Sequence, residues 1–402
     1  MVSAGRGVAF SMARLGTETA FAVSAEATEW AANGNRVYPF HLGDINLRTP
    51  VNIIDAAERA IRDGKTGYVP APGVFELREA LADNISAARG VNYRPEHVSV
   101  QPGAKPIIGK FLMSVMNPGD GVLYPNPGYP IYESQVDYLG GRGCPYSYVE
   151  EEDGFRIDRK SLEAVLSDDI RILIVNGQHN PTGADASVDE IEWLAQIARE
   201  RDLWVLADEP YFDVRYAGLS RSLVSEPEMM DRTVIGYTFS KTYAMTGWRL
   251  GAALGPPRVI ELINRLNTNH ESCTCGFIQQ AGVEALHGDR SGAEEILTTL
   301  RKRRDVVVDG LNEIDGINVH RATATFYLFV DVTSVYRRLG YHDPQEFRTD
   351  TLRKTGVAFC SRSHFGRERS GEKRIYARFA YSGIDMDDAR DGLEALKAYW
   401  ER

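Results

Sequence analysis

The middle of the chain alternates short runs of β-branched and other apolar residues with longer segments of helical periodicity. Six of these runs predict strands, at residues 97–100, 121–124, 170–176, 203–208, 233–238 and 250–254. Between them the pattern predicts helices, among them 106–116 and 187–201. Ser187, with Glu190 three residues later, forms a capping box that marks the start of the second helix. This alternation predicts an α/β fold around a mostly parallel, buried sheet.

The C-terminal part of the chain has a different pattern. Two long helical segments are followed by short strands and a last helix, at 276–286, 292–312, 325–330, 356–360, 375–380 and 388–400. These elements predict a smaller α+β domain, which the N-terminal segment completes. We therefore expect a large domain of residues 50–289 and a small domain of residues 1–49 with 290–402.

Composition and charge narrow the class of protein. The 402 residues include 46 Lys and Arg against 56 Asp and Glu, a net charge of −10. This acidic balance argues against a nucleic acid or an anionic membrane as partner, and no apolar run is long enough to cross a bilayer. The four cysteines are too few for a disulfide framework and lack the spacing of a metal site. We therefore expect no metal and a reducing, cytoplasmic setting.

Residues capable of chemistry follow four of the predicted strands, where an open α/β sheet binds its ligands. Gly103 and Ala104 open a helix after the first strand, and their backbone amides suit a phosphate. The other strand ends carry Asn180, Asp208 with Tyr211, and Ser240 with Lys241 and the more distant Arg249.

Each of these residues alone has an ordinary explanation. Lys241 could be a solvated loop lysine, Asp208 a helix cap and Asn180 a turn former. Arg249 could pair with a surface carboxylate. Together they match the needs of one ligand, a pyridine aldehyde phosphate. Such a group requires an amine for its Schiff base, an anion for its ring nitrogen, a donor for its phenolic oxygen and a phosphate cup.

Four motifs extend this match: Ser-Lys-Thr-Tyr-Ala-Met-Thr-Gly-Trp-Arg-Leu-Gly from Ser240, His-Asn-Pro-Thr-Gly from His179, Asp-Glu-Pro-Tyr from Asp208, and Tyr-Pro-Asn-Pro-Gly-Tyr from Tyr124. With them the chain resembles a fold-type-I pyridoxal-phosphate enzyme of the class I/II aminotransferase family along nearly its whole length. The resemblance implies a large domain with a mostly parallel seven-stranded sheet, a smaller α+β domain from both termini, and a homodimer. It also implies transfer of an amino group from an L-amino acid to a 2-oxo acid such as 2-oxoglutarate.

The resemblance assigns cofactor roles residue by residue. Lys241 matches the lysine that forms the Schiff base and moves the α-proton, and Asp208 matches the aspartate paired with the ring nitrogen. Asn180 and Tyr211 match donors to the phenolic oxygen, and Tyr129 matches the aromatic that stacks on the ring. Lys241, Asp208 and Tyr211 are thus the expected catalytic residues. The implied phosphate contacts come from Gly103, Ala104, Lys105, Thr238, Ser240 and Arg249.

Substrate and partner roles follow in the same way. Arg378 matches the arginine that binds the α-carboxylate, with Gly43 and Asn180 beside it. Tyr68 matches a tyrosine that reaches the phosphate of the neighbouring subunit, which implies a shared active site; the alternative is a buried core tyrosine. In one branch of aspartate aminotransferases a lysine at the position of Lys105 reaches the substrate's distal carboxylate. This favours aspartate or glutamate as donor.

The sequence departs from the family pattern around the expected substrate entrance. The segment 44–50 after Gly43 lacks the usual proline and carries Arg48, and the later turn carries Arg362 and His364. These three side chains are candidates for recognising an acidic group. The alternative is that they are solvated loop residues.

Two other functions stay open from the sequence. The same cofactor site could serve β- or γ-elimination, substitution or C–C bond formation on an amino acid. A non-catalytic regulator that senses the cofactor would need a basic DNA-binding segment, of which this acidic sequence gives no sign.

Overall fold

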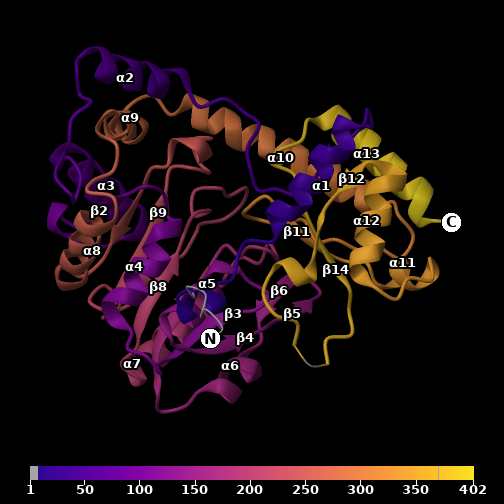
Figure 1. Ribbon diagram of the computed structural model, residues 1–402, viewed down its shortest axis with the longest axis horizontal. Coiled ribbons are helices and arrows are strands. Elements are labelled where there is room, and N and C mark those ends of the chain that lie inside the picture. Colours follow the sequence, from indigo (N-terminus) through magenta and orange to yellow (C-terminus); the bar gives the residue numbers. More distant parts are fainter. Residues whose placement is uncertain (1–7, 370) are drawn as a thin grey trace, which may run out of the picture.

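The computed structural model describes residues 8–369 and 371–402. The centre of its larger part is a seven-stranded sheet of order β2-β10-β9-β8-β7-β3-β4 (Figure 1). Its strands are Val98–Gln101 (β2), Gly121–Pro125 (β3), Arg142–Tyr146 (β4), Ile170–Val175 (β7), Trp204–Asp208 (β8), Thr233–Thr238 (β9) and Gly251–Leu254 (β10). Only β10 runs antiparallel to its neighbours. The expected mostly parallel seven-stranded sheet is confirmed.

The hydrophobic pattern located six of these strands and missed β4. The interior strand β9 is buried at every position, which is why its sequence is almost continuously apolar. β4 lies at the edge of the sheet and is only partly buried, so its sequence, Arg-Gly-Cys-Pro-Tyr, needs no such run. A proline is tolerated there because an edge strand leaves one row of backbone groups unpaired.

Helices cover both faces of the sheet. Along β7, Ile172 and Ile174 pack in the core shared with α4, α5 and α8, whereas Leu173 and Val175 pack in the core shared with α6 and α7. Ser187 and Glu190 make both bonds of the predicted capping box at the start of α7. The helices of this part are Val51–Arg62 (α2), Phe75–Arg89 (α3), Lys105–Val115 (α4), Ile131–Leu139 (α5), Arg159–Val165 (α6), Val188–Glu200 (α7), Pro257–His270 (α8) and Gly276–His287 (α9).

A smaller α+β part lies beside the sheet (Figure 1). Its antiparallel sheet has the order β11-β14-β13, and a short N-terminal strand β1 pairs in parallel with β12. The strands are Tyr38–Pro39 (β1), Tyr327–Asp331 (β11), Val357–Ala358 (β12), Cys360–Ser361 (β13) and Tyr376–Ala380 (β14). The helices are Ala20–Ala32 (α1), Ser291–Asn312 (α10), Thr333–Arg338 (α11), Pro344–Thr355 (α12) and Met386–Trp400 (α13).

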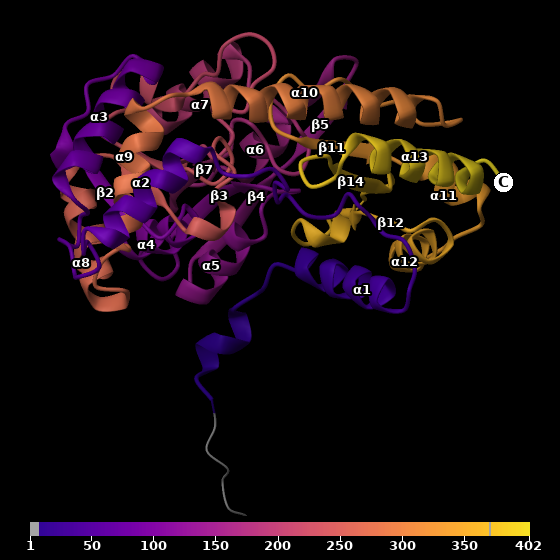
Figure 2. The ribbon, with the colours of Figure 1, turned by 90° about the horizontal axis from the view of Figure 1, so that it is seen from above.

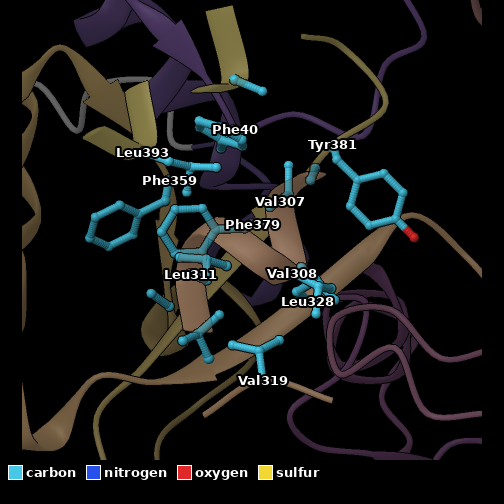
Figure 3. Packing of buried hydrophobic residues seen from close by; sticks show 14 of the residues in the cluster. Phe40, Val307, Val308, Leu311, Val319, Leu328, Phe359, Phe379, Tyr381 and Leu393 are labelled. Atoms are coloured by element: carbon cyan, nitrogen blue, oxygen red, sulfur yellow. The ribbon is translucent and has the colours of Figure 1, made fainter. Parts of the chain in front are cut away.

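The core of this smaller part joins residues from both ends of the chain. Phe40 from the N-terminal segment packs in one cluster with Leu311 of α10 and with Phe359 and Phe379 (Figure 3). This agrees with the prediction that the N-terminal segment completes the smaller domain. The remaining regular elements are a hairpin and short 3₁₀ turns: Tyr148–Glu151 (β5), Gly154–Ile157 (β6), Phe10–Arg14 (η1), Pro95–His97 (η2), Leu223–Ser225 (η3), Thr246–Trp248 (η4) and Arg362–His364 (η5).

Helix α10 connects the two parts and runs along one side of the molecule (Figure 2). Ala293 in its first turn packs in the core of the larger part, whereas Ile296 and the buried apolar residues after it pack in the core of the smaller part. The predicted division at 49/50 and 289/290 stays a prediction, and residues 1–7 and 370 of the predicted small domain lie outside the described residues. No helix within 8–369 or 371–402 is long and apolar enough to cross a membrane.

Candidate active site

A cavity of about 590 Å³ opens where β2, β7, β8 and β9 end. It is bounded on the other side by residues of the smaller part, including Gly43, Tyr327 and Arg378. Most of the residues predicted from the sequence line it: Gly43, Ala104, Lys105, Tyr129, Asn180, Asp208, Tyr211, Thr238, Ser240, Lys241, Arg249 and Arg378.

Two of the predicted residues do not line this cavity. Gly103 lies directly behind it, because a Cβ on Gly103 would lie 2.2 Å from Nη2 of Arg249. Tyr68 is 90% exposed on the surface. The alternative of a buried core tyrosine at this position is therefore wrong.

Lys241 lies three residues after the end of β9, and its amine is buried between the two parts of the chain. Its Nζ donates a hydrogen bond of 2.7 Å to the backbone carbonyl of Gly43. Burial lowers the pKa of Lys241 to about 8, although the carboxylates of Asp44 and Glu18 act in the opposite direction. A substantial fraction of this amine is therefore neutral, and so nucleophilic, near physiological pH.

Asp208, the last residue of β8, is a buried carboxylate. The Tyr132 hydroxyl donates a hydrogen bond of 2.5 Å to it, and burial raises the pKa of Asp208 to about 6. Among the described residues it makes no ion pair. A buried carboxylate without a cation is costly unless a ligand supplies the positive charge.

An anion-binding corner lies between β2 and β9. Ala104 precedes the first turn of α4, where helix amides lack intrahelical partners. The hydroxyls of Thr238 and Ser240 bond to each other at 2.8 Å. Gly103 has φ +90°, a conformation that favours glycine, and its missing side chain leaves room for Arg249.

The opposite wall of the cavity is formed by Arg378 on β14. Its two terminal nitrogens donate to Oδ1 of Asn180 at 2.9 Å and to the carbonyl of His41 at 2.6 Å. The guanidinium carbon lies 4.5 Å from the centre of the Tyr327 ring, and the Tyr327 hydroxyl bonds to that of Tyr211 at 2.9 Å. A side chain that is fixed in this way is well placed to grip a carboxylate.

Among the cavity residues that sequence reasoning missed, three contact side chains of the predicted site. Tyr132 on α5 holds Asp208, Tyr327 on β11 holds Tyr211, and Glu18 accepts hydrogen bonds from the side chains of Lys105 and Tyr129. Tyr132 lies in the first turn of α5, only three residues after Tyr129, but no motif quoted from the sequence extended to it. Glu18 precedes any recognisable motif, and no sequence signal placed it near Lys105.

The three departures from the family pattern lie away from the cavity. Arg362 is buried and binds Glu372 and Asn126, each at 2.7 Å, whereas His364 is buried against Ser361. Arg48 is exposed, and none of the three lines the cavity. The hypothesis that they read an acidic group in this cavity is wrong. For Arg362 and His364, the alternative of solvated loop residues is also wrong, because both side chains are buried.

Comparison with known proteins gives matches along most of the chain. A family profile for aminotransferase class I and II matches residues 37–396. An aspartate aminotransferase of Musicola paradisiaca is 34% identical over 397 residues, which is 98% of each chain. The structure of the aspartate aminotransferase from Rhizobium meliloti aligns with a TM-score of 0.91 at 28% identity, over 99% of this chain and 100% of that one. An alanine aminotransferase from Pyrococcus furiosus aligns with a TM-score of 0.90 at 26% identity, over 98% and 100%.

Proposed function

The chain belongs to the class I and II aminotransferase family, and on this premise we propose that it moves the amino group of L-aspartate or L-glutamate to a 2-oxo acid such as 2-oxoglutarate. The observation that carries the proposal is a buried lysine amine and a buried unpaired carboxylate in one cavity. The Musicola relative, named an aspartate aminotransferase, supports the choice of donor. The names of these relatives favour transamination over elimination, substitution or a regulatory role. A cytoplasmic location stays a prediction.

The residues of the cavity fit pyridoxal 5'-phosphate. The protonated ring nitrogen would supply the cation that Asp208 lacks, and Lys241 offers the amine for the aldehyde. Arg249 and the amide of Ala104 fit the phosphate, in a corner that a side chain at Gly103 would close. We propose that the remaining contacts come from Lys105, Tyr129, Asn180, Tyr211, Thr238 and Ser240.

When bound, pyridoxal phosphate supplies an aldehyde that takes up the amino group and a ring that withdraws electrons from the α-carbon. The chain's own part is to hold charges and move protons. Asp208 keeps positive charge at the ring nitrogen, and Asn180 and Tyr211 donate to the phenolic oxygen. Lys241 Nζ accepts the proton from the α-carbon of the bound amino acid, because its lowered pKa of about 8 leaves a fraction of it unprotonated near physiological pH.

Arg378 is the proposed site for the α-carboxylate of the donor. Its guanidinium presents two parallel N–H groups, and it already donates to Asn180 and to the carbonyl of His41. Gly43 lies beside it, and a Cβ there would lie 2.0 Å from the Tyr327 hydroxyl, so only glycine fits. Lys105 is the proposed contact for the donor's distal carboxylate.

The exposure of Tyr68 supports the proposal of a homodimer with a shared active site. A phenol that is 90% exposed is available to a neighbouring subunit, and the nearby helices α2 and α3 expose Val51 and Phe75 at 71% and 54%. A partner copy would cover this apolar surface. Sedimentation of the cofactor-loaded protein at the mass of two chains is the expected result, and the mass of one chain would exclude the proposal.

The proposed reaction is tested by its first half-reaction, in which the amino group passes from the donor to the cofactor. The protein is loaded with pyridoxal phosphate, and absorption spectra are recorded before and after L-aspartate or L-glutamate is added, without any oxo acid. We expect the visible cofactor band to be lost in favour of a near-ultraviolet band, with release of the matching 2-oxo acid. A visible band that persists with both amino acids would exclude them as donors.

The pH dependence of cofactor attachment should follow the Lys241 amine. Only the neutral amine attacks an aldehyde, so the rate should rise about tenfold per pH unit below the pKa and level off above it. With the pKa lowered to about 8 by burial, the midpoint should lie near pH 8. The measurement is the growth of visible absorbance when pyridoxal phosphate meets the cofactor-free protein. A rate that is still rising at pH 10 would contradict the prediction.

A further inference from the structure

Glu18 is a cavity residue for which the proposed reaction has no role. It lies just before α1, and its side chain is 22% exposed. Its Oε2 pairs with Lys105 Nζ at 2.7 Å and accepts a hydrogen bond of 3.1 Å from the Tyr129 hydroxyl. The residue proposed to bind an acidic donor is thus already paired with a carboxylate of the chain itself.

The surroundings of this pair form a small site for an ammonium group. Besides the Glu18 carboxylate, the rings of Phe21 and Tyr129 each have their centre 5.8 Å from Lys105 Nζ. Aromatic faces attract cations, so carboxylate and rings act in the same direction. The Lys105 side chain is 45% exposed and flexible, so another ammonium could replace its own there.

The two arginines of the cavity are not available to the side chain of an acidic donor. Under the proposed function, Arg249 is matched by the cofactor phosphate, Arg378 by the α-carboxylate and Asp208 by the ring nitrogen. Lys105 then remains paired with Glu18. The Asp44 carboxylate of the same cavity acts on the Lys241 amine and accepts hydrogen bonds from Thr246 Oγ1 and from the amide of Ile45. A carboxylate of the donor would bring a second negative charge to Lys105.

Resting on the proposed aminotransferase activity, we propose that Glu18 is a specificity-determining residue that weakens binding of acidic donors and admits an L-amino acid whose side chain ends in an ammonium group. An acidic donor has to displace Glu18 from Lys105 before it can be bound. A basic donor instead takes the place of Lys105 between Glu18 and the two rings. The α-amino group is transferred in both cases, so the reaction itself is unchanged.

The test compares donors in the half-reaction, so that no acceptor competes for the same site. Cofactor-loaded wild type and Glu18→Gln react with L-aspartate, L-lysine, L-ornithine or L-alanine, and loss of the visible band gives a second-order rate constant for each. Glu18→Gln should raise the constant for aspartate and lower that for the faster basic donor, each by about tenfold. Alanine, which reaches neither Glu18 nor Lys105, should change by less than about twofold.

A matched control is Glu29→Gln, which removes the same charge from an exposed position on α1. It should leave all four constants unchanged. The proposal is overturned if Glu18→Gln changes the ratio of aspartate to basic donor by less than about fivefold. It is also overturned if wild type reacts with alanine or aspartate but with neither basic amino acid. Failure of all four donors and of L-glutamate would instead overturn the proposed function itself.

Succinate gives a readout that does not depend on turnover. It carries two carboxylates and no amine, so it can span Arg378 and Lys105 without reacting. Calorimetric titration of the loaded protein should show about tenfold tighter binding by Glu18→Gln than by wild type, because Lys105 is released. Equal affinity would overturn the proposal.

Discussion

Replacement of Lys241 by alanine should lower transamination by about 10⁴-fold. The variant loses both the amine that attaches the cofactor and the base that takes the α-proton. Alanine leaves no side chain that could do either, and among the described residues Lys105 is the only other lysine that lines the cavity. The measurement is amino transfer from L-aspartate to 2-oxoglutarate, together with borohydride treatment followed by mass analysis. Wild type should carry the cofactor covalently on the peptide that contains residue 241, and the variant should not.

The control for this variant is Lys160→Ala, because Lys160 is exposed on α6 and does not line the cavity. It should retain full activity and covalent labelling. A Lys241→Ala protein that keeps more than about one-tenth of wild-type activity would show that another group is the base. That result would remove the central residue of the proposed mechanism.

Replacement of Asp208 by asparagine should lower the rate by about 10²- to 10³-fold, the loss expected when one preorganised electrostatic contact is removed. Asparagine is close in shape and still accepts the Tyr132 hydrogen bond, but it carries no charge. The ring nitrogen of the cofactor is then no longer held in its protonated form. The rate of the half-reaction with L-aspartate checks this, and an unchanged rate would contradict it.

The same variant should make the cofactor-free protein more stable at neutral pH. The pKa of Asp208 is raised by burial to about 6, so the folded state binds a proton more readily than the unfolded state between about pH 4 and 6. Stability therefore falls as pH rises through that window, and the penalty at pH 7 is roughly 3 kcal/mol. Asp208→Asn removes this penalty and should leave stability at pH 3.5 almost unchanged.

Urea denaturation of the cofactor-free proteins at pH 7 and pH 3.5 measures this difference. Asp168→Asn is the control, because the Asp168 side chain is fully exposed and the only ion pair it makes within 8–369 and 371–402, to Arg201, spans 3.5 Å. It should change stability by less than about 0.5 kcal/mol at either pH. A destabilised Asp208→Asn would show that the carboxylate is needed for the fold rather than for a ligand.

The large sheet was open to prediction because burial on both faces imposes a local signature. Strands such as β7 and β9 must be apolar at nearly every position, and that run is visible without knowing any neighbour. Edge strand β4 and the two-residue strand β1 carry no such run. Tyr38 of β1 pairs with Val357 of β12, far away in the chain, so β1 forms only where the tertiary structure provides an edge to pair with.

The sequence by itself determined the side of the cavity that we propose for the cofactor, because Asn180, Asp208 and Lys241 lie at or after the ends of parallel strands that the sheet brings to one edge. Their positions therefore follow from the local order of the elements along the chain. Only the tertiary structure decided the substrate side. Glu18 meets Lys105 because the N-terminal segment crosses the cavity, and Arg362 turns into the protein because it finds Asn126 there. Long-range contacts between single polar side chains leave no periodic pattern, so the sequence alone could not reveal them.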